Sequence, residues 1–321
     1  METIEQINGE YSFTRRLRTF GAWGLLFCFF SLIFNGFLMM EWVQTEEGLW
    51  QVVEREDPSL LLALMFFVVL FIGLVSLLVF LITGFITKFH YERQMLPRKI
   101  GFTEFAFYAA WVFISISLVE IGVMLFVPGA DETDKIAWYD ALLPSLLMAG
   151  IGLVLYRRNL SFLGFQKPTS YRWMILVCIL LYAVVYFLDE WIIDLTTSIA
   201  GIDPVSYREN LIYDTLNDAK ATSWFILFLL VLDVGVIGPI AEEVFFRGFL
   251  QQALVRRMGT IGGVLLASFV FAAFHVDIAY FAPLFLSGLL LGILRVVFRS
   301  LWAPILLHII NNTVAVVLGL L

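Results

Sequence analysis

The sequence contains little charge for its length. Charged residues make up 15% of its 321 residues, whereas about 25% is typical of soluble domains. Hydrophobic residues make up 61%, and several stretches of around 20 residues carry almost no charge. Such stretches are typical of transmembrane helices. The composition therefore excludes an ordinary soluble domain and predicts an all-α polytopic protein embedded in a lipid bilayer.

Features of several other protein classes are also missing. The two cysteines, Cys28 and Cys178, both lie in apolar runs, so there is no disulfide framework and no CxxC metal motif. We expect both to be packing residues. No basic patch with interleaved aromatic residues is present, which argues against a nucleic-acid partner. No internal repeat is visible either.

The apolar runs predict about nine transmembrane helices. The first, Phe20 to about Met40, is too long for a signal-peptide core and lacks a small-x-small cleavage site, so we expect it to be retained. The remaining predicted spans are 59–87, 104–127, 138–156, 171–193, 223–256, 261–277, 280–297 and 301–320.

The same pattern suggests three parts of the chain. Residues 1–200 are predicted to form N-terminal membrane helices of unassigned role. Residues 201–222 are predicted to form an acidic extracytoplasmic loop, interpreted as a solvated connector, with a cap over the outer mouth as the alternative. Residues 223–321 are predicted to form a C-terminal catalytic helix bundle.

The charges in the loops predict an orientation. Loops at 88–99, 157–172, 256–257 and 295–299 are basic, whereas those at 41–57, 131–134 and 189–218 are acidic. Because basic loops are retained in the cytoplasm, the N-terminus is predicted to be cytoplasmic and the C-terminus external. We expect an integral multi-pass protein of a bacterial cytoplasmic membrane.

The segment 223–256 is too long for one straight crossing. As a helix it would measure about 50 Å, whereas the hydrocarbon core is about 30 Å thick. We therefore expect one crossing that is bent or broken at Gly235, Gly238 and Pro239, residues that permit kinks.

Three ionisable residues follow directly after this predicted break. Glu242, Glu243 and Arg247 interrupt a run that is otherwise apolar on both sides. Glu243 and Arg247 are four residues apart, so they share a helix face in the favourable order for an ion pair. Glu242 is turned about 100° away and remains available. Ionisable groups at membrane depth indicate a functional site, although a buried ion-pair triad is the structural alternative.

Further polar residues lie in the last apolar runs. His275 ends one run, and His308 and Asn312 are spaced to share one helix face in another. Measured at about 1.5 Å per residue from the nearest cytoplasmic helix ends, these residues and Glu242 all fall within the hydrocarbon slab. A single buried histidine is usually a packed core residue, but an acid, two histidines and an amide at overlapping depths favour chemistry.

Together these motifs resemble the signature of the CPBP family, which contains the CAAX prenyl endopeptidases and the bacteriocin-processing or Abi proteins. The resemblance rests on Glu242-Glu243-x-x-x-Arg247, Phe271-x-x-x-His275 and His308-x-x-x-Asn312. It covers roughly residues 220–320. It implies a glutamate-type intramembrane endopeptidase in which Glu242 and His275 activate a water molecule.

The resemblance also implies roles for the other motif residues. His308 and Asn312 would stabilise the oxyanion, and Glu243 and Arg247 would be supporting residues. No metal cofactor is implied, although a zinc site formed by His275, His308 and Glu242 is the alternative. The expected substrate is a membrane-associated peptide or protein.

Two other classes of function compete with the protease hypothesis. One is a non-proteolytic membrane scaffold or regulator that binds a sensor protein through its spans. The other is a proton-coupled transporter, because intramembrane acids and histidines also form proton relays. The lack of repeats between the two halves is mildly unfavourable for transport.

Overall fold

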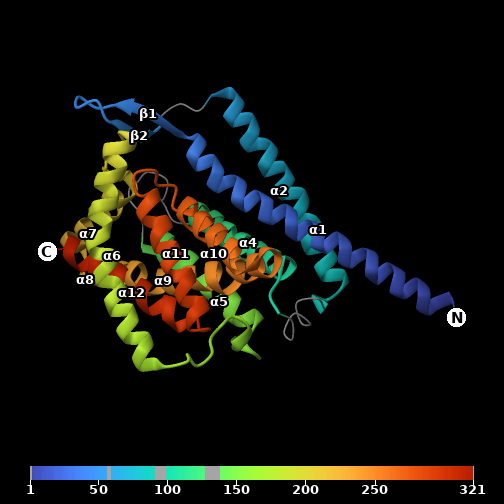
Figure 1. Cartoon of the computed structure of the whole chain (residues 1–321). Coiled ribbons are helices and arrows are strands. Elements are labelled where there is room, and N and C mark those ends of the chain that lie inside the picture. Colours follow the sequence, from blue (N-terminus) through green and yellow to red (C-terminus); the bar gives the residue numbers. More distant parts are fainter. Residues whose placement is uncertain (1, 56–58, 91–98, 127–137, 321) are drawn as a thin grey trace.

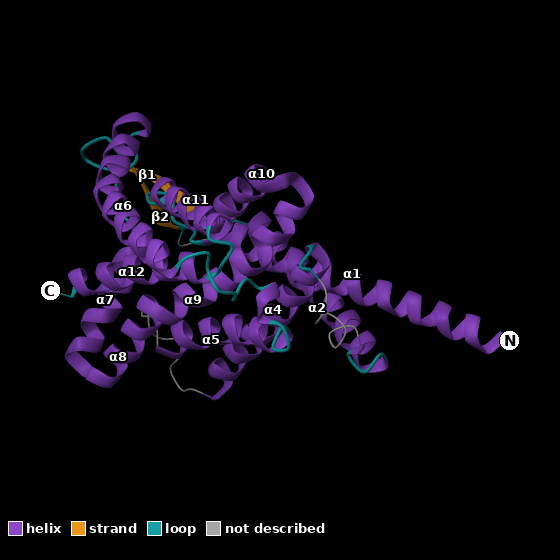
Figure 2. Ribbon diagram, turned by 60° about the horizontal axis from the view of Figure 1, so that its bottom comes forward, coloured by secondary structure: helices purple, strands orange, loops and turns teal. Residues whose placement is uncertain are grey.

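The computed structural model describes residues 2–55, 59–90, 99–126 and 138–320. These parts of the chain are mainly helical (Figures 1 and 2). In chain order the elements are α1 (Glu2–Leu38), β1 (Met40–Gln44), β2 (Trp50–Glu54), α2 (Leu60–Ile86), α4 (Phe102–Phe126), α5 (Trp138–Leu155), the short 3₁₀ helix η1 (Leu160–Phe162), α6 (Tyr171–Ala200), α7 (Tyr207–Thr222), α8 (Trp224–Leu232), η2 (Asp233–Ile237), α9 (Gly238–Glu243), η3 (Val244–Leu250), α10 (Gln251–Phe274), α11 (Phe281–Val297) and α12 (Trp302–Gly319).

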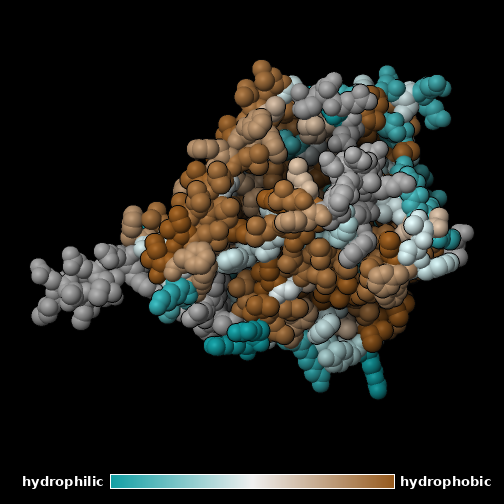
Figure 3. Space-filling model, turned by 180° about the vertical axis from the view of Figure 1, so that it is seen from behind, coloured by the Kyte–Doolittle hydropathy of each residue, from teal (hydrophilic) through white to brown (hydrophobic). Residues whose placement is uncertain are grey.

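The predicted class, an all-α polytopic membrane protein, is confirmed. Six helical segments are long and apolar enough to cross a membrane, and two shorter apolar helices accompany them in the described parts of the chain. Large apolar side chains cover much of the visible surface (Figure 3). Helix α2 is the clearest case, since it is strongly apolar and yet mostly exposed. Such a surface suits contact with lipid rather than water.

The longest of these segments is helical from Trp224 to Phe274. Its backbone leaves helical geometry at Gly259, where φ is 80° and ψ is 173°. Gly259 therefore separates the two spans predicted at 223–256 and 261–277.

The expected break at Gly235, Gly238 and Pro239 is a change of helix type instead. η2 and η3 are π-helical, and α9 between them is a short α-helix. The N–H of Gly238 donates to the carbonyl of Asp233, five residues earlier. Pro239 lies in the first turn of α9, where its missing N–H costs little. The chain thus absorbs glycine and proline without leaving the helix. Such π segments are frequent at functional sites.

Two hydrogen bonds each join segments that the charge pattern assigns to the same side of the membrane. On one side, the Trp50 N–H donates to the Gly201 carbonyl at 2.7 Å, so the two acidic segments meet. On the other, the Arg256 guanidinium donates to the Lys99 carbonyl at 2.6 Å, which joins two basic segments. Loops assigned to one side therefore contact each other. One feature of the acidic side was not predicted from the sequence, namely the antiparallel hairpin formed by β1 and β2.

The acidic segment at 201–222 is not a solvated connector, contrary to the interpretation favoured above. Most of it forms α7, which buries Thr215, Leu216 and Ala219. The hydroxyl of Ser206, just before this helix, contacts the carboxylate of Asp277 at 2.5 Å. α7 is therefore held against the C-terminal helices at both of these places.

The N-terminal helices pack directly on the helix that carries the acidic motif. Phe245 of η3 contacts Phe29 of α1, Phe105 and Tyr108 of α4, and Phe274 of α10. These residues belong to one hydrophobic core that extends over both halves of the chain, with Phe29 and Phe274 packed at its edge. Helices α1 and α4 of the N-terminal half thus pack directly against η3, which follows Glu242 and Glu243.

Candidate active site

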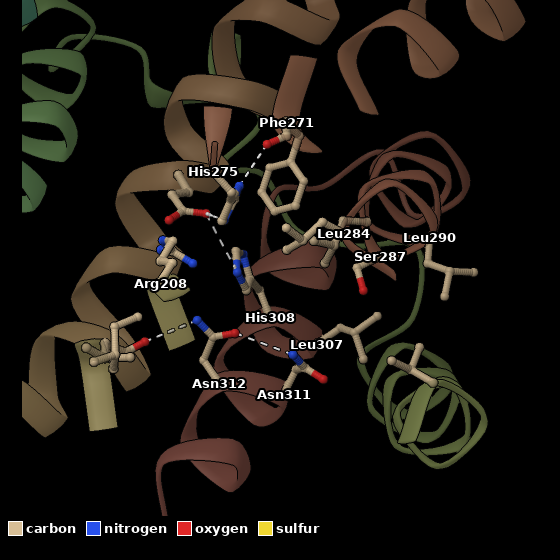
Figure 4. Close-up of a pocket in the computed structure, with 15 residues that line it drawn as sticks. Arg208, Phe271, His275, Leu284, Ser287, Leu290, Leu307, His308, Asn311 and Asn312 are labelled. Atoms are coloured by element: carbon tan, nitrogen blue, oxygen red, sulfur yellow. Dashed lines mark hydrogen bonds and ion pairs between the residues drawn. The ribbon is translucent and has the colours of Figure 1, made fainter. Parts of the chain in front are cut away.

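The residues predicted to form the site converge from three helical segments on one cavity of about 140 Å³ (Figure 4). Glu242 comes from α9, between the two π-helical stretches, and His275 follows the last residue of α10. His308 and Asn312 come from successive turns of α12. Apolar side chains form much of the remaining wall, and α6 and α7 contribute to it as well.

Glu242 faces both histidines through a single carboxylate oxygen. Its Oε2 lies 3.8 Å from Nε2 of His275 and 3.8 Å from Nε2 of His308. Both distances exceed a direct hydrogen bond. The Glu242 side chain keeps 18% of its surface accessible, whereas those of His275 and His308 keep 6% and 7%. Of the three, the carboxylate is therefore the group most accessible from the cavity.

The other nitrogen of each imidazole has a fixed partner. Nδ1 of His275 lies 2.8 Å from the carbonyl oxygen of Phe271, one turn earlier. Nδ1 of His308 lies 2.9 Å from Oε1 of Glu243. Since a carbonyl and a carboxylate can only accept, the hydrogen-bond network assigns a proton to both Nδ1 atoms. Each Nε2 is then directed toward Glu242.

Glu243 and Arg247 form the predicted ion pair, with Arg247 Nη1 2.7 Å from Glu243 Oε1. Both side chains are buried. Arg247 also donates through Nη2 to the Gly288 carbonyl at 3.1 Å, which links η3 to α11. Gly288 has no side chain, so the backbone of α11 can lie close to α10. An added Cβ would lie 3.1 Å from Ser268 of α10. The pair thus connects three helical segments.

The link from Glu243 to His308 was missed by the sequence analysis, which assigned Glu243 only to Arg247. The two residues are 65 positions apart, so no periodicity on a single helix could reveal it. Its consequence is geometric: the buried carboxylate accepts from Nδ1 and so fixes the orientation of the His308 imidazole. This partner therefore sets which nitrogen of His308 faces the cavity.

Asn312 is held by the π-helical stretch before Glu242. Its Nδ2 donates to the carbonyl of Val234 at 3.2 Å. Its Oδ1 accepts from the amide of Asn311 at 3.4 Å. An amide nitrogen carries two protons, so one N–H of Asn312 is left for a ligand. Asn311 also lines the cavity, although it is off the face shared by His308 and Asn312.

Arg208 of α7 is a cavity residue that the sequence analysis did not identify. Its side chain lies beside His275 and His308 (Figure 4), and it lines the same cavity as Glu242. The only available signal was weak: a single arginine within a mainly acidic segment. Asp233 is buried at the start of η2, with Ser145 as a hydrogen-bond partner.

The geometry of a metal site is not recognised in the described parts of the chain, where no group of three or more His, Cys, Asp or Glu side chains is arranged to hold an ion. Glu242, His275 and His308 do supply one oxygen and two nitrogens of the kind that bind zinc. In this structure Nε2 of each histidine lies 3.8 Å from the same oxygen, Oε2, of Glu242.

Comparison with known proteins finds a family match for the segment that carries the acidic and histidine motifs. Residues 222–314 match the family of type II CAAX prenyl endopeptidase Rce1-like proteins. A Bacillus subtilis (strain 168) protein named "Putative membrane peptidase YdiL" is 27% identical over 92 residues. This match covers 29% of the present chain and 38% of that relative. No solved structure matches the chain.

The matched segment contains all three motifs and every residue of the predicted site. The resemblance to the CPBP family of membrane proteases is therefore confirmed over this segment. The chain is an integral multi-pass membrane protein whose C-terminal third is related to membrane peptidases.

Proposed function

We propose that this protein is an intramembrane endopeptidase of the glutamate type. The observation that carries the proposal is the approach of two imidazole Nε2 atoms to one oxygen of Glu242, inside a cavity with mainly apolar walls. The match of residues 222–314 to CAAX-type endopeptidases supports the same class of reaction. The relative from Bacillus subtilis supports a bacterial cytoplasmic membrane as the location.

In the proposed reaction Glu242 acts as the general base. A water molecule beside its carboxylate loses a proton to Glu242, assisted by the free Nε2 of His275, and its oxygen attacks the scissile carbonyl carbon. Such general-base catalysis typically contributes 10²- to 10⁴-fold. After the tetrahedral intermediate forms, the C–N bond breaks and the proton passes from Glu242 to the leaving amine.

The proposed oxyanion site is made by His308 and Asn312. For His308 to donate to the oxyanion, it carries a proton on Nε2 in addition to the Nδ1 proton that it donates to Glu243. Arg247, Glu243, His308 and Glu242 then carry two positive and two negative charges, so the buried cluster is neutral. Donors fixed before the reaction are effective because they need no reorganisation in the transition state.

The cavity supports a substrate that is apolar with an anionic group. Leucine and valine side chains supply much of its wall, and Arg208 supplies a cation at the α7 side. A membrane-associated peptide or protein with a carboxylate near the scissile bond would satisfy both features. The charge of Arg208 would select the position of the cleavage rather than perform it.

The test compares Glu242→Gln with Glu120→Gln, both expressed from the native locus at matched levels. Glu120 is an exposed acid on α4 and does not line the cavity. Quantitative proteomics of membrane peptides should find uncleaved precursors accumulating in Glu242→Gln cells alone. A phenotype that survives Glu242→Gln would instead support the scaffold or regulator, and proton-driven flux in vesicles without cleavage would support the transporter.

A chelator distinguishes the zinc alternative. The glutamate mechanism predicts that cleavage by the purified protein persists after prolonged dialysis against a strong chelator. Loss of activity that is restored by added zinc, and not by magnesium, would assign Glu242, His275 and His308 to a metal site instead.

A further inference from the structure

A second cavity, lined in part by cationic side chains, lies at the basic end of the bundle and does not include Glu242 in its lining. It has a volume of about 390 Å³ and lies between α10, the end of α11, η1 and the residues that precede α4. Four cationic side chains line it: Lys99, Arg256, Arg295 and Arg299. No aspartate or glutamate is among its lining residues in the described chain. Four like charges around one cavity repel each other unless an anion lies between them.

Arg295 is the most buried of the four cations. It is partly buried, and no acceptor in the described chain bonds to its Nε, which is shielded from solvent. Its guanidinium packs against Gly164, where φ is 105°. A Cβ added at Gly164 would lie 2.5 Å from Nη2 of Arg295. The positive φ favours glycine at this position, and the absence of a side chain leaves room for the guanidinium. An unpaired buried guanidinium N–H is costly, which indicates that a ligand completes the site.

The walls of this basic cavity are held rigid by hydrogen bonds between loops. The N–H of Leu301 donates to the Gly164 carbonyl at 2.8 Å. The hydroxyl of Ser300 donates to the Gln166 carbonyl at 2.7 Å, and the Gln166 amide donates to the Arg299 carbonyl. These bonds fix the loop that carries Arg299 to the loop that follows η1. The cations are therefore placed before any ligand arrives, which reduces the entropic cost of binding.

The residues of α10 that line this cavity connect it to the helices of the proposed active site. Gln251 lies one turn after Arg247, and its amide donates to the Gly292 carbonyl at 3.1 Å. Arg247 makes the equivalent contact with Gly288, also at 3.1 Å. Arg256, further along α10, donates to the carbonyls of Lys99 and Ile100. A ligand here would thus contact α10, α11 and the start of α4 together. Glu104, outside the lining, is engaged with the N–H of Gly101 at 3.0 Å.

We propose that this cavity binds a phosphate anion, supplied by the headgroup of an acidic phospholipid or by a soluble phosphate compound. Guanidinium groups bind phosphate through paired hydrogen bonds. The basic loops around the cavity are those predicted to face the cytoplasm, where basic pockets between transmembrane helices bind anionic headgroups. The inference does not depend on the protein being a protease.

The experiment uses the full chain in nanodiscs and measures ligand binding by the shift in thermal unfolding and by native mass spectrometry. One arm titrates phosphatidylglycerol into phosphatidylcholine discs. The other adds inorganic phosphate to discs of pure phosphatidylcholine. The test variant is Arg295→Gln/Arg299→Gln. Arg157→Gln/Arg158→Gln is the matched control, because it removes the same charge from exposed residues on the same predicted side, outside the cavity.

The wild type and the control should bind equally, whereas the test variant should bind about tenfold more weakly, equivalent to ~1.4 kcal/mol. Binding in the lipid arm alone assigns a headgroup, and binding in both arms or in the phosphate arm alone assigns the phosphate group as the ligand. The single variant Arg299→Gln, at an exposed position, provides the test if the double variant fails to fold. No binding by the wild type, or equal loss in the control, would overturn the proposal.

Discussion

Nδ1 of His308 lies 2.9 Å from the same Glu243 oxygen that Arg247 Nη1 approaches to 2.7 Å. One buried carboxylate oxygen therefore serves a cation on its own helix and an imidazole on α12. The ion pair of Glu243 with Arg247 therefore also orients His308, the proposed oxyanion donor. Substitution of Glu243 should therefore lower both the free energy of unfolding and kcat.

Glu243→Ala should lower the free energy of unfolding by about 3–5 kcal/mol, because it leaves Arg247 buried without its partner. Glu242→Gln should change stability little, since the Glu242 side chain is partly exposed and no salt bridge joins it to an arginine among the described residues. Denaturant or thermal unfolding of the purified proteins measures both. Equal stability of the two variants would contradict the assigned role of Glu243.

Asn312→Ala should lower kcat by about 10²- to 10³-fold, as expected for removal of one oxyanion donor. Asn311→Ala is the matched control on the adjacent residue, and its effect should be small. Single-turnover cleavage of an identified substrate separates kcat from binding. If Asn311→Ala proves the more damaging change, the amide role belongs to Asn311.

Arg208→Gln should raise KM for a substrate with a carboxylate near the scissile bond by roughly fivefold, the effect of about 1 kcal/mol at an exposed charge. The value of kcat should remain nearly unchanged, because Arg208 lies on α7 and takes no part in the proposed proton transfers. Arg208→Lys should retain part of the affinity. An equal change in KM for a substrate lacking the carboxylate would exclude this role.

Gly164→Ala should destabilise the protein by about 2 kcal/mol, since a side chain at positive φ is strained and would also clash with Arg295. Gly150→Ala is the control: no heavy atom lies within 4 Å of its added Cβ, and it lies inside α5. Alanine favours helix over glycine, so this control should be neutral or slightly stabilising. Thermal unfolding in one detergent compares the two.

Membrane-impermeant thiol reagents test the predicted orientation. Glu47→Cys should be labelled on intact cells, whereas Arg257→Cys should be labelled only after permeabilisation, because basic loops are expected inside. Background labelling should be low, since Cys28 and Cys178 are both buried. The reverse pattern would invert the topology without changing which loops share a side.

The sequence by itself determined the membrane class, because apolar runs of spanning length are a local property of the chain. It also determined the ion pair of Glu243 with Arg247 and the shared face of His308 and Asn312, since both follow from helical periodicity. The helix boundaries near Gly235 were predicted less well, because glycine and proline permit several backbone responses, of which the π-helical one depends on neighbouring helices.

Only the tertiary structure decided which distant groups meet. Glu243 reaches His308 across 65 residues, and Arg208 enters the proposed active site from a segment that reads as an acidic loop. The basic cavity likewise gathers Lys99 and Arg295 from different halves of the chain. Such contacts arise from how packed helices are placed in space, and no period within a single helix encodes that placement.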